Sequence, residues 1–525
     1  MSSEPGLAWI QTCSVALLLT GLVSRIAPLF DHGGRLMRQF PTEDGFLMMT
    51  VARNLALGHG LTSSAGAIPT NGVQPLFTFV QSLVFLVVIG DKRDGVLLVM
   101  VLHIVLALLG AWLIHRLAGR LLAGHTHRSS ISLLAATLWF ACPVVVNNSM
   151  NGLESGLYVV CLLTVLSVWL ADRPHIFRTQ VSLGLLWVGV LLGVAFWARN
   201  DAVFLVVVMT AWHVLYGLRG RREDLAVRIK EALLMGAGAL GVAAPWLIFN
   251  QTRFGSIVPI SALSQTAETA FGANLVNVPS KLFEYISIVL PVPTALETHG
   301  AVVAVTSVIT IVFFVSAVAM ARRLGGATGL FIHVVLSFAL LMTVYYGLFH
   351  GAPWFISRYF FPLSPFMAIL SVTYLLSGIT HLVARRQRAW SRVIATVLVV
   401  LALALNVRVY VEGPENQYLQ LVAWIEANVA DGQWVGAPQS GTIGYFHDLT
   451  VNLDGKLNPE ALQAKQADRF PDYIVNGTFG ASQDRIAYIV DWKHIAKWRR
   501  IPLIDSNFEL IEKDAHANLA VWRRR

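Results

Sequence analysis

Long apolar runs separated by short polar loops limit what this 525-residue chain can fold into more than any other feature. A helix needs about 20 mainly apolar residues to cross roughly 30 Å of hydrocarbon. Runs of about that length lie at 8–28, 95–116, 131–148, 155–171, 182–198, 202–218, 231–250, 300–320, 327–348, 362–380 and 393–410. The pattern predicts a polytopic α-helical membrane protein with about eleven transmembrane helices.

The composition agrees with a membrane protein. Charged residues make up 13% of the chain, well below the roughly 25% of a soluble domain. The formal net charge is +9, but most arginines lie in loops between apolar runs, so the charge does not point to nucleic acid. The three cysteines lie in apolar stretches and give neither a disulfide framework nor a metal-ligand spacing.

The basic loops orient the chain. Arginines gather at 116–128, 219–230, 322–323 and 385–392, and all four loops face one side if the short apolar stretch 75–90 does not cross. Since basic loops stay in the cytoplasm, we expect a cytoplasmic N-terminus and a membrane-interface or re-entrant position for 75–90. If 75–90 spans the membrane instead, every later assignment inverts. The first run lacks a basic segment before it, so we expect a retained span rather than a cleaved signal.

The opposite side then receives the first outer loop and a polar C-terminal tail. We divide the chain into a membrane domain, 1–410, with amphipathic helices in the loop 31–94, and a small extracytoplasmic α/β domain, 411–525. Alternating apolar residues and turn signals in the tail predict a helix and several strands. The helix is expected over 416–430, and strands over 434–438, 449–453 and 472–475, with a last pair near 508–523.

Charged residues collect at the outer ends of the predicted spans. Glu43 and Asp44 open a predicted amphipathic helix that ends near Gly58, where a left-handed cap is available. The other outer charged or polar positions are Arg53, Glu154, Arg199, Asp201, Arg358 and Tyr359. Arginines and carboxylates at one end of a bundle indicate an outward-facing polar cavity, because arginine suits phosphate and a carboxylate suits proton abstraction.

The stretch FPTEDGFLMMTVARNLALGHG (40–60), followed by TNGVQPL (70–76), resembles the outer loop of the GT-C glycosyltransferase superfamily. That superfamily includes protein O-mannosyltransferases, lipid A aminoarabinose transferases and actinobacterial arabinofuranosyltransferases. GLES (152–155), WARND (197–201), QSGTIGYF (439–446) and VNLDG (451–455) are similar to bacterial members. The tryptophan-tryptophan-aspartate motif of oligosaccharyltransferases is absent from the sequence.

The resemblance implies an inverting glycosyltransferase. It would move a sugar from a polyprenyl-phosphate donor to an envelope glycan, lipid or protein, on the outer face of a bacterial cytoplasmic (inner) membrane. Cell wall biogenesis is the implied process, and arabinofuranose or another pentose is the donor sugar that the resemblance favours. It implies no cofactor and no metal site, although a divalent cation stays open.

Residue roles follow from the matching positions. In the lipid A and mannosyl families the catalytic aspartate lies nine residues before the helix arginine, as Asp44 does before Arg53. Those families place a second acid after the aspartate. Here Gly45 follows it and Glu43 precedes it, so Asp44 is the expected base and Glu43 the second candidate.

The remaining expected site residues surround these acids. Arg358 with Tyr359 resembles the outer-loop arginine that contacts the lipid-linked phosphate, with Arg53 and Arg199 as further candidates. The expected substrate cavity contains Glu154, Asp201, Asn71, Gln74, His350 and Trp354.

Each of these residues also has a plain structural interpretation. Asp44 and Glu154 suit helix caps, Arg53 an ion pair, Arg358 a headgroup contact and Trp354 an interfacial anchor. Arg199 and Asp201 can pair with each other.

At the level of the whole protein, a transporter or flippase of lipid-linked sugars is the alternative, but it predicts ionisable residues near span centres and paired broken helices. A non-catalytic receptor or scaffold is a third interpretation, and it leaves the acidic pair without a task.

Overall fold

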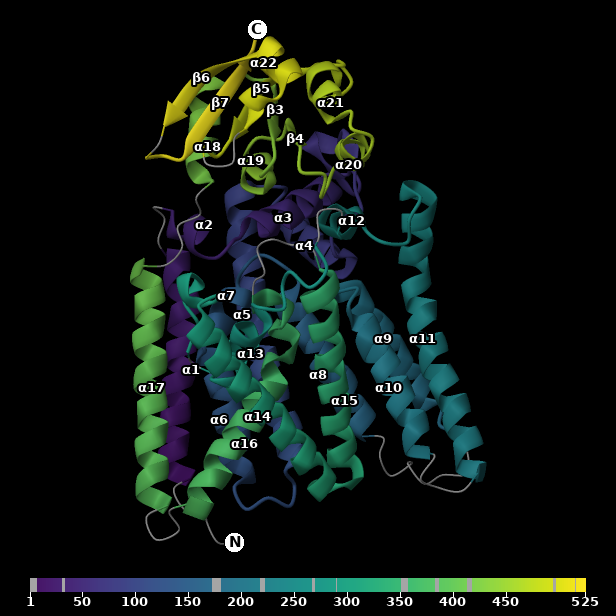
Figure 1. Cartoon of the computed structure of the whole chain (residues 1–525), viewed down its shortest axis with the longest axis vertical. Helices are drawn as coiled ribbons and strands as arrows, with labels where there is room; N and C mark the ends of the chain where they lie inside the picture. The colour runs from purple at the N-terminus through teal and green to yellow at the C-terminus, as the bar shows by residue number, and fades with distance from the viewer. Residues whose placement is uncertain are drawn as a thin grey trace.

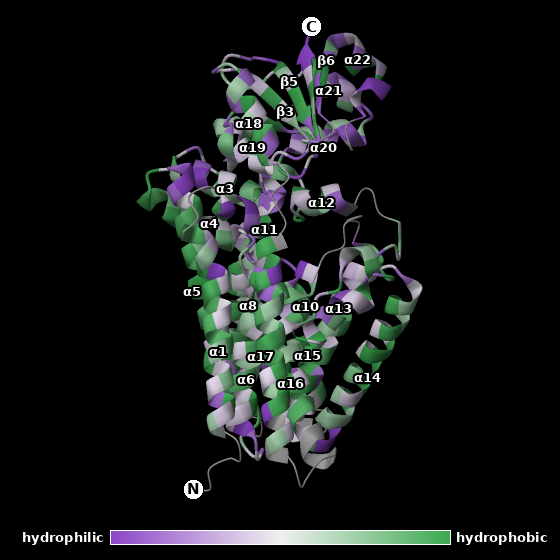
Figure 2. Cartoon of the chain, turned by 90° about the vertical axis from the view of Figure 1, so that its left-hand side faces the viewer, coloured by the Kyte–Doolittle hydropathy of each residue, from purple (hydrophilic) through white to green (hydrophobic). Residues whose placement is uncertain are grey.

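The computed structural model describes residues 7–30, 34–171, 181–217, 222–266, 270–288, 290–350, 357–382, 387–412, 418–493, 497–514 and 516–525. A tall bundle of helices carries a smaller α/β domain at one end (Figure 1). Apolar residues dominate the bundle, whereas polar residues gather near the junction and in the upper domain (Figure 2).

A helix lies at each of the eleven predicted spans, with the third divided in two. The bundle consists of α1 (Leu7–Ile26), α5 (Lys92–Leu121), α6 (Arg128–Ala141), α7 (Pro143–Ser149), α8 (Ser155–Ala171), α9 (Gly184–Ala198), α10 (Ala202–Gly217), α11 (Arg222–Phe254), α14 (Gly300–Leu324), α15 (Gly326–Val344), α16 (Ser364–Leu382) and α17 (Gln387–Glu412). Among the described residues, six helices are long and apolar enough to cross a membrane, or seven if α6 and α7, bent by 63°, form one span. Further apolar helices, including α8, α9 and α10, are shorter. The chain is a multi-pass helical protein, and the count of eleven crossings stays a prediction.

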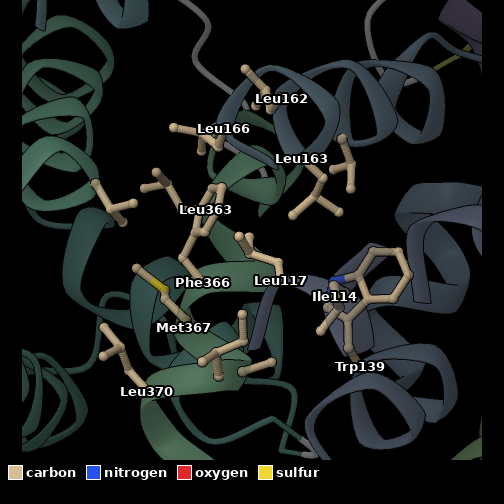
Figure 3. Packing of buried hydrophobic residues seen from close by; sticks show 14 of the residues in the cluster. Ile114, Leu117, Trp139, Leu162, Leu163, Leu166, Leu363, Phe366, Met367 and Leu370 are labelled. Carbon is tan, nitrogen blue, oxygen red and sulfur yellow. The ribbon is translucent and has the colours of Figure 1, made fainter. Parts of the chain in front are cut away.

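The interior of the bundle is a continuous apolar core. Leu117, Leu166 and Phe366 pack together from three helices, next to Trp139 (Figure 3). The Trp139 indole N–H donates to the Ser364 hydroxyl at 2.8 Å, so its one polar group is satisfied inside the bundle. On the outside, α14 leaves a row of apolar side chains uncovered, Val305, Val308, Val312 and Val315. Such a surface suits contact with lipid rather than water.

A layer of short elements lies between the bundle and the α/β domain. It contains α2 (Arg35–Gln39), α3 (Glu43–Ala56), the hairpin β1 (Thr62–Ser63) and β2 (Ile68–Pro69), α4 (Pro75–Val87), α12 (Ile260–Thr266) and α13 (Val278–Ile286). The predicted helix after the acidic pair is confirmed as α3. Its N-cap is Thr42, whose hydroxyl accepts from the Gly45 N–H at 3.1 Å, and Gly58 follows its end with a positive φ of 84°.

The C-terminal domain is built on a five-stranded sheet in the order β4-β3-β5-β7-β6. Its strands are β3 (Trp434–Ala437), β4 (Thr450–Asn452), β5 (Ile486–Asp491), β6 (Phe508–Asp514) and β7 (Leu519–Arg524). β3 pairs in parallel with β4 and β5, while β7 is antiparallel to both neighbours. The helices are α18 (Leu419–Asn428), α19 (Gly441–Phe446), α20 (Pro459–Gln466), α21 (Phe470–Asn476) and α22 (Pro502–Asn507).

Most predicted elements of the tail are present, and one is wrong. The helix expected over 416–430 is α18, and the strands expected at 434–438, 449–453 and near 508–523 are β3, β4 and the pair β6–β7. The segment 472–475 is helical, not extended. Pro471 occupies the first turn of α21, a position that proline favours, and Ile474 and Val475 are buried on one face. A short apolar run does not distinguish a strand from a buried helical turn.

The C-terminal domain is fastened to the bundle across α3. The Glu43 carboxylate accepts hydrogen bonds from the N–H of Gly441, from the N–H of Thr442 at 2.9 Å and from the Thr442 hydroxyl at 2.8 Å. Next to this contact, the rings of Phe46 and Tyr445 lie 5.2 Å apart. Glycine at 441 permits the approach, because a Cβ there would overlap the carbonyl oxygen of Glu43. The close contact leaves no room for a side chain between the domains.

We expect Gly441→Ala to destabilise the protein by about 1–3 kcal/mol, the usual cost of overpacking a closely packed contact. Gly444→Ala is the matched control, because it lies in the same helix and its Cβ would meet the nearest atom, on Thr450, at 3.7 Å. Thermal unfolding of both variants in detergent measures the difference. Equal midpoints would contradict the tight contact at Gly441.

Candidate active site

A cavity of ≈ 520 Å³ lies at the junction of the bundle, α3 and the C-terminal domain. Most of its polar lining comes from positions far apart in the sequence: Asp44, Gln74, Glu154, Arg199, Asn200, Asp201, Tyr346, His350, Arg358, Tyr359 and Lys456. Apolar side chains complete it, among them Leu47, Met48, Val203, Phe204 and Leu247. A pocket of this size with a few convergent charges is typical of a ligand site.

Asp44 lies between two cations in this cavity. One carboxylate oxygen is 2.7 Å from a guanidinium nitrogen of Arg358, and the other is 3.4 Å from the Lys456 ammonium. Burial alone would raise the pKa of Asp44, but Lys456 and Arg358 outweigh burial and hold that pKa well below its usual range. Asp44 is therefore ionised in the structure and its charge is balanced.

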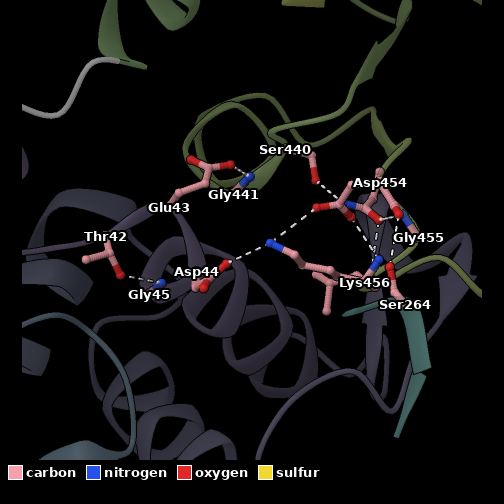
Figure 4. A network of polar contacts seen from close by, with 12 residues as sticks. Thr42, Glu43, Asp44, Gly45, Ser264, Ser440, Gly441, Asp454, Gly455 and Lys456 are labelled. Carbon is pink, nitrogen blue, oxygen red and sulfur yellow. Dashed lines mark hydrogen bonds and ion pairs between the residues drawn. The ribbon is translucent and has the colours of Figure 1, made fainter. Parts of the chain in front are cut away.

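Glu43 points away from Asp44, although the two residues are adjacent (Figure 4). Its carboxylate is held by Gly441 and Thr442 rather than by cavity residues. Burial raises the pKa of Glu43 to about 7, despite the hydrogen bonds from Thr442 and Gly441 that favour the charged form. Glu43 as the second candidate for the base stays a prediction, and in the structure its carboxylate holds the C-terminal domain.

A second ionic cluster forms the deeper wall. The Arg199 guanidinium lies 3.0 Å from the Asp201 carboxylate and 3.8 Å from that of Glu154, and it donates to the Tyr346 hydroxyl at 2.8 Å. Tyr346 in turn donates to Asp201 at 2.6 Å. Arg199 also approaches the carbonyl oxygen of Arg358 at 3.4 Å. Arg199 and Asp201 therefore pair with each other and also line the cavity, as each of the two interpretations predicted.

Four residues that line the cavity each carry a buried side-chain atom with no hydrogen-bond partner within the described part of the chain. The atoms are Gln74 Oε1, Asn200 Oδ1, Asp201 Oδ1 and His350 Nε2. Buried polar atoms are normally paired, with protein or with water. Burial lowers the pKa of His350 to about 4, so its ring is neutral near pH 7 and one nitrogen is able to accept. These four residues therefore keep unused hydrogen-bonding capacity beside the cavity.

Besides Glu43, two described residues of the expected site, Arg53 and Asn71, are not among the residues that line the cavity. Arg53 donates to the carbonyl of Gly90 at 2.6 Å and pairs with Asp448 at 3.0 Å, so it supports the domain contact instead of a phosphate site. Asn71 donates to Asn250 at 3.1 Å and accepts from the N–H of Ile260 at 3.1 Å. It braces the loop that carries Gln74. Trp354 lies outside the described residues.

Sequence analysis missed Lys456, Tyr346 and Asn200. Asn200 lies inside WARND, a motif already singled out, so that signal was available. Lys456 follows VNLDG directly, but nothing local shows that it meets Asp44, which is 412 positions away. Tyr346 had no distinguishing signal. Among the described residues, no group of three or more histidine, cysteine, aspartate or glutamate side chains is placed to hold a metal ion.

Comparisons with known proteins bear on the fold. A family model described as "Domain of unknown function (DUF8728)" matches residues 406–522. No curated protein sequence matches the chain. ArnT from Cupriavidus metallidurans, bound to undecaprenyl phosphate, is similar in structure, with a TM-score of 0.60 at 12% identity over 97% of each chain.

Two structures from Archaeoglobus fulgidus are also similar. Its oligosaccharyltransferase tethered with an acceptor peptide gives a TM-score of 0.55 at 12% identity, over 98% of this chain and 74% of that one. The oligosaccharyltransferase AglB, in complex with an inhibitory peptide and a dolichol-phosphate, gives 0.52 at 12% identity over the same shares. These likenesses extend over nearly the whole chain, so the protein has the fold of the GT-C superfamily.

Proposed function

We propose that the protein is an inverting glycosyltransferase that uses a polyprenyl-phosphate sugar donor. The observation that carries the proposal is the 2.7 Å pair of Asp44 and Arg358, on the wall of a cavity in a GT-C fold. This ion pair combines a carboxylate able to take a proton with a cation suited to phosphate. The similar ArnT structure is bound to undecaprenyl phosphate and the similar AglB structure to a dolichol-phosphate, which supports a lipid-linked donor.

The chemistry requires one base and a stabilised leaving group. Asp44 takes the proton from an acceptor hydroxyl while that oxygen bonds to the anomeric carbon of the sugar. The bond from the anomeric carbon to the phosphate oxygen breaks, and its electron pair stays on the lipid phosphate. A single attack from the opposite face inverts the anomeric centre, as in inverting hydrolases. Arg358 stabilises the charge that grows on the departing phosphate.

The sugar is proposed to lie against the unpartnered atoms of Gln74, Asn200, Asp201 and His350. Sugar hydroxyls are hydrogen-bond donors, and these atoms are acceptors or, for His350, able to accept. Apolar residues beside them, such as Phe204 and Leu247, suit the first part of the prenyl chain. Within this class, a pentose such as arabinofuranose is the donor sugar we propose to test first.

The acceptor is proposed to be an envelope glycan, lipid or protein, met on the outer face of the bacterial cytoplasmic membrane. The basic loops support a cytoplasmic N-terminus and an extracytoplasmic C-terminal domain. A flippase of lipid-linked sugars is the competing function. It needs no base, so the effect of replacing Asp44 separates the two.

Asp44→Asn is expected to reduce sugar transfer by about 10²–10⁴-fold, the usual contribution of general base catalysis. Release of free polyprenyl phosphate from a panel of polyprenyl-phosphate sugars, with envelope acceptors, measures the rate. The matched control is Asp505→Asn, at an exposed position of α22 in the C-terminal domain. Equal turnover in wild type and Asp44→Asn would remove Asp44 from the chemistry.

The pH dependence of kcat/KM distinguishes the two adjacent acids, because it reports the essential base of the free enzyme. Although burial opposes ionisation of Asp44, Lys456 and Arg358 keep its pKa well below the usual range. With Asp44 as base, kcat/KM stays flat as the pH falls from about 8 to about 5. The pKa of Glu43 is raised to about 7, so a Glu43 base predicts a decline of about tenfold per pH unit below that value. A decline that begins near neutrality would favour Glu43.

Arg358→Gln is expected to lower kcat/KM by about 10- to 100-fold, the worth of one charged hydrogen bond to phosphate. Arg53→Gln is the comparison, because Arg53 lies in α3 but pairs with Asp448 outside the cavity. It is expected to lower the unfolding midpoint while kcat/KM stays within about threefold of wild type. A loss of activity in Arg53→Gln equal to that in Arg358→Gln would return Arg53 to the phosphate site.

A further inference from the structure

Lys456 is the one charged side chain of the C-terminal domain among the cavity residues. It lies in the turn after β4, and its ammonium is 3.4 Å from the Asp44 carboxylate and 3.6 Å from Asp454 (Figure 4). We propose that Lys456 binds the donor phosphate together with Arg358, and that it does so by leaving Asp44. This inference rests on the proposed function, and it makes the C-terminal domain a working part of the active site.

The turn that carries Lys456 is fixed within its own domain. The side-chain oxygen of Asn452 accepts from the N–H of Gly455 at 3.1 Å and of Leu457 at 3.2 Å. The amide of Asn452 donates to the Ser440 hydroxyl at 2.7 Å, and the carboxylate of Asp454 accepts from the Lys456 N–H at 2.8 Å. Asn452 is buried, so this support is shielded from water. The backbone of the turn is held in place and only the lysine side chain is long enough to move.

The same turn is also fastened to the membrane domain. A Cβ at Gly72, in the outer loop, would overlap the carbonyl oxygen of Lys456, so the two backbones are in direct contact. Ser264 of α12 donates its hydroxyl to the carbonyl oxygen of Asp454 at 3.2 Å. The turn therefore contacts the membrane domain at both Gly72 and Ser264, and these two contacts fix the position from which the Lys456 side chain extends.

The charge on the donor supplies the chemical reason for a second cation. A sugar phosphodiester carries one negative charge, and the lipid phosphate that leaves it carries nearly two. Arg358 alone matches the first charge. As the bond to the sugar breaks, the phosphate gains the second charge, and Lys456 is the nearby cation that matches it.

The two cations differ in how they are held. Arg358 contacts Asp44 at 2.7 Å, whereas the Lys456 contact is longer, at 3.4 Å. A lysine is a flexible point charge on a four-carbon stem, and its ammonium retains freedom that a guanidinium fork lacks. Lys456 is therefore the cation that moves from carboxylate to phosphate. Its departure removes a positive neighbour from Asp44 and makes that carboxylate a stronger base.

The test measures binding of undecaprenyl phosphate against undecaprenol, which has the same chain without the phosphate, to full-length protein in detergent. The dissociation constant of undecaprenol divided by that of undecaprenyl phosphate is the ratio that isolates the phosphate contribution. Lys456→Met is expected to lower this ratio by about tenfold or more, the value of one charged contact. Lys456→Arg keeps most of it, and Lys513→Met, an exposed change on β6, leaves it unchanged. A general folding defect would weaken both ligands and leave the ratio intact.

A second variant covers the case in which Lys456→Met does not fold. Asp44→Asn removes the competing carboxylate, so it is expected to bind undecaprenyl phosphate more tightly than wild type does. Adding Lys456→Met removes both members of the pair, leaves neither charge unbalanced, and is expected to abolish that gain. Because Asp44→Asn also frees Arg358, a purely structural Asp44–Lys456 pair predicts a gain that survives the addition of Lys456→Met.

The outcomes separate this inference from the proposed function. Wild-type protein that prefers undecaprenyl phosphate, with the same preference in folded Lys456→Met, overturns the role of Lys456 and leaves the transferase standing. Wild-type protein with no preference for the phosphate overturns both. A preference that falls in Lys456→Met and survives in Lys456→Arg supports the role of the C-terminal domain.

Discussion

The ion pair between Asp44 and Arg358 is the contact on which the site depends. Removing two charges from water is costly, and a buried pair is maintained only when the surroundings satisfy both partners. Here Lys456 adds a second cation to the carboxylate, and Thr42 caps the helix on which Asp44 lies. The pair therefore needs three parts of the chain at once: the outer loop, the segment before α16 and the C-terminal domain.

The start of α3 serves two purposes with two neighbouring residues. Successive side chains on a helix point about 100° apart, the angle implied by 3.6 residues per turn. Glu43 therefore reaches the backbone of Gly441 and Thr442, while Asp44 faces the cavity. Because both lie in one helical turn, the contact that docks the C-terminal domain also fixes the direction of the Asp44 carboxylate.

The sequence was informative where a local pattern has one physical solution. Apolar runs of sufficient length must be helices, since lipid leaves no other partner for their backbone groups, and the helices lie where those runs predicted. It was less informative where partners are remote. The spacing of Asp44 and Arg53 marks one helix, but only the docked domain determines that Arg53 meets Asp448 and not the cavity. Likewise, the segment 472–475 is apolar enough for a strand, and its packing beside the sheet made it a helix.

The cavity contains both signs of charge in near balance, and this has a consequence for the ligand. Asp44 and Asp201 are offset by Arg358, Lys456 and Arg199, and Glu154 lies beside Arg199. Burial, the largest influence on Glu154, raises the pKa of that carboxyl, while the neighbouring Arg199 guanidinium opposes the rise. A charged ligand in this cavity therefore meets cations that are already paired with carboxylates, and it has to compete with those carboxylates for them. The same ion pairs that hold Asp44 ionised in the resting protein thus set the electrostatic cost of admitting an anionic ligand, because each cation that moves to the ligand leaves its carboxylate less compensated.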